Sequence, residues 1–304
     1  IRDVERARGL GDVYKRQASE RLKRIAASLT HLLTHTPKNP YSAVCNWAKA
    51  IRRQQRKARN KGRRVPRPYA NPTCFGQLTT MDHWFAMDDL SRGLHDETAC
   101  VTFRDRATDF IAAQGVHDKS AVHVCNFLVN LTALGEKLVY CYTDGAKELA
   151  KACIQLQVAH DPTIPGNKKQ NAVAERANGV VQMGTRALLM QAGLPPPYWT
   201  YAVRYFCLCY NARKPDQVDS SWKRRFGYEF DGDLLPFGSL VRYMPPPESR
   251  YRVAKTGGTM VPGIYLGYVH KAGGMVGPEG YLVPIRQLDG LNMTTGRTHQ
   301  GKRP

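Results

Sequence analysis

Three carboxylates stand in settings where acidic side chains can do chemistry. Asp82 follows the run 75–81, Asp144 ends the apolar stretch 138–143, and Glu175 lies near the start of a long helical pattern. Acids at two strand ends and on a helix can converge on a pair of divalent ions, although they are distant in sequence. Carboxylate oxygens are the ligands that Mg²⁺ or Mn²⁺ prefers, and two such ions can promote attack on a phosphodiester.

Each of these acids also has a simpler interpretation. An Asp that follows a strand is usually a turn or capping residue, and a single Glu on a helix is usually solvated. Asp88, Asp89 and Asp105 compete with Asp82 for the first position, but none of them follows a motif like the one that precedes Asp82.

The apolar pattern around these acids predicts a sheet with flanking helices. Short runs rich in β-forming residues alternate with segments of helical periodicity. The expected strands are 77–81, 100–104, 109–114 and 138–142, and the expected helices are 119–131, 148–156 and 171–191. This order is typical of an α/β domain with a mixed sheet.

The third helix carries a polar stripe. Asn171, Glu175, Asn178, Gln182 and Arg186 recur every three or four residues, whereas the apolar positions fall on other faces that can pack. We expect this stripe to face metal ions and DNA. Lys168 and Lys169, in the loop just before the helix, are placed to contact a phosphate.

The charge of the chain favours a nucleic-acid partner. Its 304 residues carry a formal net charge of +20, which attracts polyanions through counterion release. A block without acidic residues contributes Arg52, Arg53, Arg56, Lys57, Arg63 and Arg64. We expect this block to be a linker that follows a phosphate backbone, although a solvated charge run or a nuclear-import signal has the same composition.

The cysteine pattern and the hydropathy favour an intracellular location without a membrane partner. The eight cysteines include no CxxC pair, no secretory signal opens the chain, and no apolar run is long enough to span a bilayer.

The segment 171–176 resembles the Gln-Asn-Gly-Val-Ala-Glu-Arg signature of integrases from copia-type LTR retrotransposons, with Ala172 in place of Gly. The resemblance continues through 188–195 and 262–268 and covers roughly 30–268. It implies a ribonuclease-H-like mixed five-stranded sheet with flanking helices. It also implies that Asp82, Asp144 and Glu175 form the catalytic triad.

The same resemblance implies an activity. Asp82 would contact two Mg²⁺ ions, and Asp144 and Glu175 would each hold one of them. The enzyme would process DNA ends and join them to target DNA, as a homo-oligomer on DNA and in the nucleus. Two departures leave a catalytically impaired, integrase-derived nucleic-acid-binding protein as the alternative: Ala172, and a spacing of only 30 residues between Asp144 and Glu175. A basic structural RNA-binding protein is a third possibility, but it leaves the ordered acids unexplained.

The resemblance further implies a small helical zinc-binding segment near the N-terminus. His31 and His35 lie one helical turn apart, and Cys45 follows, but Ser42 stands where the first cysteine of a pair is expected. Because a hydroxyl is a poor substitute for a thiolate, we expect weak or no zinc binding. The alternative is that both histidines are simply packed or at the helix surface.

The predicted organisation has six parts. They are a leader at 1–17 that resembles translated sequencing adaptor, a helical His/Cys segment at 18–48, a basic linker at 49–70, an integrase catalytic core at 71–222, a small β-rich domain at 223–289, and a disordered tail at 290–304. The β-rich part either helps to hold DNA or only buttresses the core.

Overall fold

The computed structural model describes residues 17–49, 71–86, 88, 90–162, 172–215, 218–245, 256–293 and 297–298. The predicted leader up to residue 16 and almost all of the basic linker therefore lie outside the described residues, as do Lys168, Lys169 and Asn171.

A five-stranded sheet forms the centre of the fold. Its strands are β1 (Thr79–Phe85), β2 (Ala99–Asp105), β3 (Ile111–Val116), β4 (Tyr140–Thr143) and β5 (Ala159–Pro162), in the order β3-β2-β1-β4-β5. The first three strands pair antiparallel, β4 runs parallel to β1, and β5 runs parallel to β4. This is the mixed sheet of a ribonuclease-H-like fold, and the predicted fold class is confirmed.

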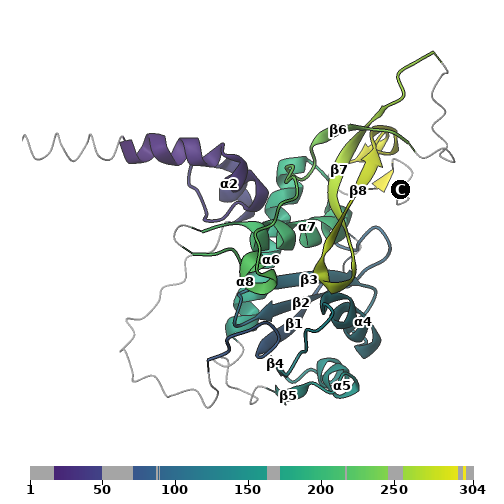
Figure 1. The fold of residues 1–304 in the computed structure, drawn as a ribbon. Helices are drawn as coiled ribbons and strands as arrows, with labels where there is room; N and C mark the ends of the chain where they lie inside the picture. Colours follow the sequence, from purple (N-terminus) through teal and green to yellow (C-terminus); the bar gives the residue numbers. More distant parts are fainter. Residues whose placement is uncertain are drawn as a thin grey trace, which may run out of the picture.

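Helices cover both faces of this sheet. They are α4 (Ala121–Leu131), α5 (Lys147–Gln155), α6 (Ala172–Ala192) and α7 (Trp199–Ala212), the last preceded by the short η1 (Pro196–Tyr198). Figure 1 shows α6 and α7 together along one face, and α4 and α5 on the other side. Because both faces are covered, five of the seven residues of β2 form an unbroken buried run.

One prediction about β1 was wrong. The strand was expected to end at Met81, which would put Asp82 after it. Instead β1 continues to Phe85, because Trp84 and Phe85 pair with Cys100 and Ala99 of β2. Asp82 therefore lies inside the strand, opposite Thr102. Asp144 follows β4 directly, as predicted.

The N-terminal segment is helical and packs on the core. Residues 17–26 form one helix, followed by α2 (Leu29–Thr34) and α3 (Ala43–Ala48). Both short helices begin at serine N-caps, Ser28 and Ser42, and both contact α6 or α7.

The C-terminal part is β-rich. Its elements are α8 (Ser221–Phe226), β6 (Leu240–Tyr243), β7 (Val261–His270), η2 (Ala272–Gly274), β8 (Val276–Pro284) and η3 (Ile285–Gln287). The strands β6, β7 and β8 form an antiparallel sheet with β7 in the middle. The boundary expected between residues 222 and 223 falls inside α8.

Two short segments of the predicted tail form strands in the described residues. Leu291–Asn292 (β9) pairs antiparallel with Arg297–Thr298 (β10), and the Leu291 side chain is buried. This burial supplies an apolar anchor that the polar composition around it does not suggest.

Arg225 joins α8 and the β7–β8 turn to the core. Its guanidinium donates to Glu136 Oε2 at 2.7 Å, to Leu131 O at 2.6 Å and to Gly273 O at 3.1 Å. It also lies over the Phe75 ring, 3.8 Å from the ring centre. This buried cation therefore helps to tie the β-rich part to the predicted core.

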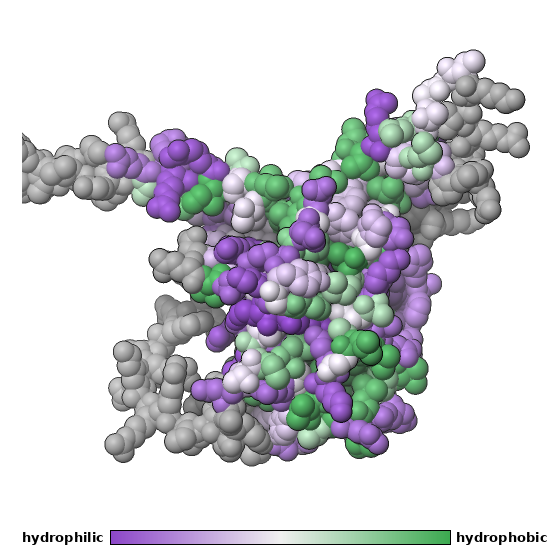
Figure 2. Space-filling model, viewed as in Figure 1, coloured by the Kyte–Doolittle hydropathy of each residue, from purple (hydrophilic) through white to green (hydrophobic). Residues whose placement is uncertain are grey.

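The surface seen in Figure 2 is mixed, but hydrophobic side chains gather where Figure 1 places α4 and α5. Val122 and Val129 of α4 and Ile154 of α5 are exposed. Within the described part of the chain, no helix combines the length and the apolarity needed to cross a membrane.

Candidate active site

Asp82 links the sheet to α6. Its Oδ1 accepts a hydrogen bond from the backbone N–H of His83 at 2.8 Å, and its Oδ2 accepts one from Nδ2 of Asn178 at 2.8 Å. Asn178 is buried, and its Oδ1 has no partner among the described residues. Two donors thus hold both oxygens of Asp82 in place.

The other two predicted acids lie close enough to act on Asp82. Burial, together with the negative charges of Asp144 and Glu175, raises the pKa of the Asp82 carboxyl to about 6, against the hydrogen bond from the His83 N–H, which lowers it. Asp82 on β1 is therefore within electrostatic reach of the acid that follows β4 and of the acid in the first turn of α6.

The partners of Asp82 are more open to solvent than Asp82 is. Asp144 and Glu175 are exposed, whereas Asp82 is partly buried. Asp144 Oδ1 accepts from the backbone N–H of Ala146 at 3.1 Å, which places this acid in the turn before α5. Glu175, in the first turn of α6, is stabilised by the positive end of the helix dipole.

Two of the three competing acids, Asp105 and Asp88, accept hydrogen bonds from the backbone of nearby turns. Asp105 is fully buried, and it accepts from the backbone of Gly76 at 2.9 Å and of Thr108 at 2.7 Å. Asp88 Oδ1 accepts from the backbone N–H groups of Leu90 and Ser91. Asp89 lies outside the described residues.

The predicted DNA-contacting residues divide into three cases. Asn178 is described and holds Asp82, so its amide is a positioning group and does not project to the surface. Arg186 is exposed, and its Nη1 donates to Ala48 O at 3.2 Å, which ties α6 to the N-terminal segment. Arg52, Arg53, Arg56, Lys57, Arg63, Arg64, Lys168, Lys169 and Asn171 lie outside the described residues.

His83, the neighbour of Asp82, was not singled out from the sequence. Its Nε2 is buried without a hydrogen-bond partner in the described part of the chain, and burial lowers the pKa of its imidazole. Nothing in the local sequence distinguishes this histidine, because its burial depends on elements far along the chain.

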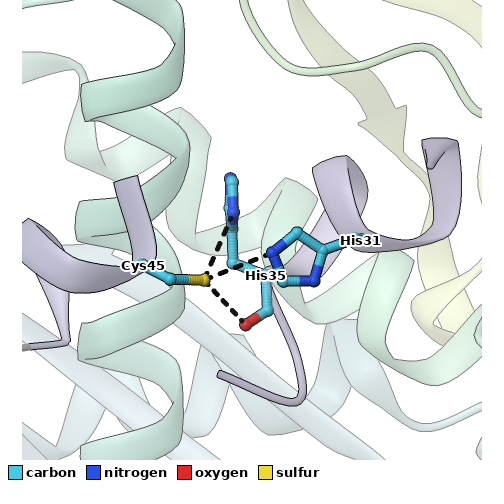
Figure 3. A group of neighbouring side chains, drawn as sticks. All are labelled: His31, His35 and Cys45. Atoms are coloured by element: carbon cyan, nitrogen blue, oxygen red, sulfur yellow. Dashed lines mark hydrogen bonds between the residues drawn. The ribbon is translucent and has the colours of Figure 1, made fainter. Parts of the chain in front are cut away.

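The predicted zinc ligands come together in the N-terminal segment (Figure 3). Cys45 Sγ lies 3.3 Å from His31 Nε2 and 3.7 Å from His35 Nδ1, and all three residues are buried. The ring of His35 is held from its other side by Gln191 Oε1 at 2.7 Å from Nε2. The possible ligand atoms of His31, His35 and Cys45 all lie within 4.8 Å of one another, and no other such group of three is found among the described residues. The acids around Asp82 are spaced more widely.

Two observations show that this cluster does not fit a closed tetrahedral zinc site. The Oγ of Ser42 is already used as an acceptor for the Cys45 N–H at 3.2 Å, so the position of the missing cysteine offers no thiolate. The buried ammonium of Lys49 donates to His35 O at 2.5 Å, which places a cation next to the cluster. The three donors present suit at most an incomplete site.

The comparisons with known proteins agree with the motifs. No family model matches the chain. It is 27% identical over 131 residues to the retrovirus-related Pol polyprotein from transposon TNT 1-94 of Nicotiana tabacum, an alignment that spans 40% of this chain and 9% of that polyprotein. The chain therefore spans only 9% of the length of this relative.

Two solved structures resemble the fold at low identity. A chain of the simian T-cell lymphotropic virus intasome in complex with PP2A regulatory subunit B56 gamma matches with a TM-score of 0.40 and 14% identity, over 74% of this chain and 82% of that one. The catalytic core domain of BIV integrase matches with a TM-score of 0.36 and 16% identity, over 49% of this chain and 92% of that one. The similarity to a retrotransposon Pol polyprotein confirms the predicted resemblance of this chain to copia-type integrases.

Proposed function

We propose that this protein integrates retrotransposon DNA, as a metal-dependent polynucleotidyl transferase and endonuclease of the integrase type. One observation supports this proposal above the others: Asn178 of α6, one helical turn after Glu175, donates a hydrogen bond to Asp82 of β1, and the charges of Asp144 and Glu175 raise the pKa of Asp82. Such a site favours bound cations, because they relieve the mutual repulsion of the carboxylates.

Each side chain has a proposed task. Asp82, Asp144 and Glu175 are the ligands of Mg²⁺ or Mn²⁺, which when bound would activate an oxygen nucleophile and neutralise the departing oxyanion. Asn178 and the His83 N–H orient Asp82 through the two hydrogen bonds described above.

The DNA partner is supported by the charge of the chain. A formal net charge of +20 is far above what solubility requires. We propose that the basic block containing Arg52 to Arg64, together with Lys168 and Lys169, contacts phosphates of the element ends and of the target. In line with the resemblance, we propose a homo-oligomer on DNA that acts in the nucleus.

Strand-transfer assays with Mg²⁺ or Mn²⁺ test the proposal. Asp82→Asn, Asp144→Asn and Glu175→Gln should each abolish joining while DNA binding persists. Asp88→Asn is the matched control, since Asp88 is an exposed turn acid, and it should join DNA at the wild-type rate. Joining that survives any of the three triad substitutions would contradict the proposal.

The alternative is an integrase-derived protein that binds nucleic acid but joins it poorly. Ala172, the first residue of α6, favours this alternative because it replaces a glycine of the family signature where the chain enters the helix. DNA binding by the wild-type protein without detectable joining in either metal would support it.

A further inference from the structure

A cavity with a volume of about 240 Å³ lies at the edge of the central sheet, where the β-rich part packs against the predicted core. Its lining comes from β3, α4 and α7 and from α8 and the turn between β7 and β8. Figure 1 shows this turn beside β3 and α4. The cavity is larger than the roughly 150 Å³ that accommodates a benzene ring in an apolar protein interior, so a small organic molecule fits.

The described lining of this cavity contains basic side chains and no Asp or Glu. The basic residues are Arg204, His270 and Lys271. Lys271 Nζ lies 3.1 Å from Glu279 Oε2, so the charge of this lysine is balanced. Burial and the nearby charge of Arg204 lower the pKa of His270 to about 4, which leaves its imidazole neutral near pH 7. Among the described lining residues, Arg204 therefore carries the one charge that no described acid balances.

Arg204 is half-buried on α7 and forms neither an ion pair nor a hydrogen bond within the described part of the chain. A guanidinium that loses hydration without gaining an acceptor is unfavourable, and its planar fork of donors matches the two oxygens of a carboxylate. Glu97 lines a second cavity, of about 270 Å³, together with Arg204. The Oε2 of Glu97 instead accepts from the backbone N–H of His95 at 2.9 Å, in its own loop. The donors of Arg204 are therefore available to a bound anion.

Two further donors belong to the lining. Trp222 is buried, and its Nε1–H has no acceptor among the described residues. The other donor is the backbone N–H of Ala113. Asn211 accepts from the Ile111 N–H at 2.9 Å and donates to Ile111 O at 2.7 Å, so the backbone groups of Ile111 point away from β2. Because these groups alternate in direction along an antiparallel strand, those of Ala113 also point outward, on the side of the cavity that it lines. Donors around an unbalanced cation select an anion.

We propose that this cavity binds a small organic monocarboxylate, whose carboxylate pairs with Arg204 and whose apolar body lies against Phe127, Leu131 and Leu208. One unbalanced cation matches one negative charge. A phosphate dianion would bring a second charge, for which the described lining holds no second unbalanced cation. The ligand would contact the core and the β7–β8 turn together, so its binding would stabilise the packing of the β-rich part. The site does not depend on the proposed DNA chemistry, since β2 separates β3 from the strand that carries Asp82.

Isothermal titration calorimetry of the full chain with benzoate and benzamide tests this site without requiring catalysis. The two probes have nearly the same shape and differ in charge, so the difference between them measures the contribution of the carboxylate. We expect benzoate to bind with a Kd of about 1 mM, which suits so small a ligand, and benzamide to bind at least about tenfold more weakly. Inorganic phosphate at the same concentration should not displace benzoate.

Variants assign the binding to this cavity. Arg204→Met should weaken benzoate binding by at least about tenfold. The melting temperature of this variant without ligand should not fall, because the substitution removes a half-buried charge that has no partner. Arg213→Met is the matched control, because Arg213 is also a half-buried arginine of α7, at its C-cap. Its guanidinium lies over the Tyr210 ring, 4.8 Å from the ring centre, and it does not line the cavity, so benzoate binding should be unchanged.

Several outcomes would overturn the inference. Equal binding of benzoate and benzamide by the wild-type protein would do so without any variant, and so would benzoate binding that Arg204→Met leaves intact. A lower melting temperature of Arg204→Met would show that the guanidinium already has a partner. Displacement of benzoate by phosphate would contradict the choice of a monocarboxylate. Glu97→Gln should leave benzoate binding unchanged, and a clear gain in affinity would place the anion in the second cavity instead.

Discussion

Replacing Asp82 with asparagine should stabilise the metal-free protein at neutral pH. In the folded state the pKa of Asp82 is about 6, against an ordinary value of 3.8, so the folded protein holds this proton more tightly than the unfolded chain does. The free energy of unfolding therefore decreases as the pH rises from about 4 to about 6, and the full cost of the charged carboxylate is present above that window.

The size of this effect follows from the shift. About two pKa units correspond to about 3 kcal/mol, and solvent screening at a partly exposed site reduces this to about 1–3 kcal/mol. Asparagine keeps one oxygen that can accept from the His83 N–H, and its NH2 group can donate to the unpartnered Oδ1 of Asn178 once that amide turns over, so the substitution removes the charge and preserves the shape. For a protein of this size, each kcal/mol corresponds to a shift of about 2–4 °C in Tm.

Denaturant unfolding in EDTA at pH 7.5 and at pH 4 measures the effect. Asp82→Asn should be more stable than the wild-type protein at pH 7.5 and equal to it at pH 4. Added Mg²⁺ should stabilise the wild-type protein and leave the variant unchanged. Asp88→Asn should show no gain at either pH, since hydrogen bonds from Ser91 already lower the pKa of Asp88. A variant that is less stable at pH 7.5, or that gains equally at both values, would refute this reasoning.

Further expectations concern packing and the His/Cys cluster. A Cβ at Gly184 would lie 2.1 Å from Phe206 Cε2, so Gly184→Ala should lower the free energy of unfolding, measured in denaturant, by about 1–3 kcal/mol. Gly179→Ala on the same helix places its methyl group in open space and should be neutral or stabilising. Arg225→Met should lower the free energy of unfolding by about 3–5 kcal/mol, because it leaves the Glu136 carboxylate without its buried cation. Lys223→Met on the same helix removes only an exposed ion pair with Asp219 and should cost under about 1 kcal/mol. Ser42→Cys should raise the zinc content of the purified protein to one equivalent. A full equivalent of zinc already bound to the wild-type protein would contradict the interpretation that its His/Cys site lacks a fourth ligand.

The sequence predicted the parts of the fold that depend on local pattern. The apolar runs and the helical periodicity located β2, β4 and α6 to within two residues of their observed ends. Pairing between distant segments decided the rest. β1 extends to Phe85 only because β2 pairs with it, and the polar, partly exposed β5 exists only through its parallel pairing with β4.

The candidate site was predictable in composition but not in detail. The acids and the His/Cys ligands could be named from their spacing and from the resemblance to a known family. The hydrogen bond from Asn178 to Asp82 joins residues 96 positions apart, and the contact of Gln191 with His35 joins residues 156 apart. The position of the Lys49 ammonium beside the His/Cys cluster was likewise not predicted, because Lys49 was assigned to the basic linker.

The most direct test of the shared site is the binding of Mn²⁺ to the full chain, followed by electron paramagnetic resonance. The wild-type protein should bind the ion, and Asp82→Asn, Asp144→Asn and Glu175→Gln should each weaken binding by at least about tenfold, whereas Asp88→Asn should not. If any one of the three substitutions leaves Mn²⁺ binding unchanged, the three carboxylates do not act as one metal site.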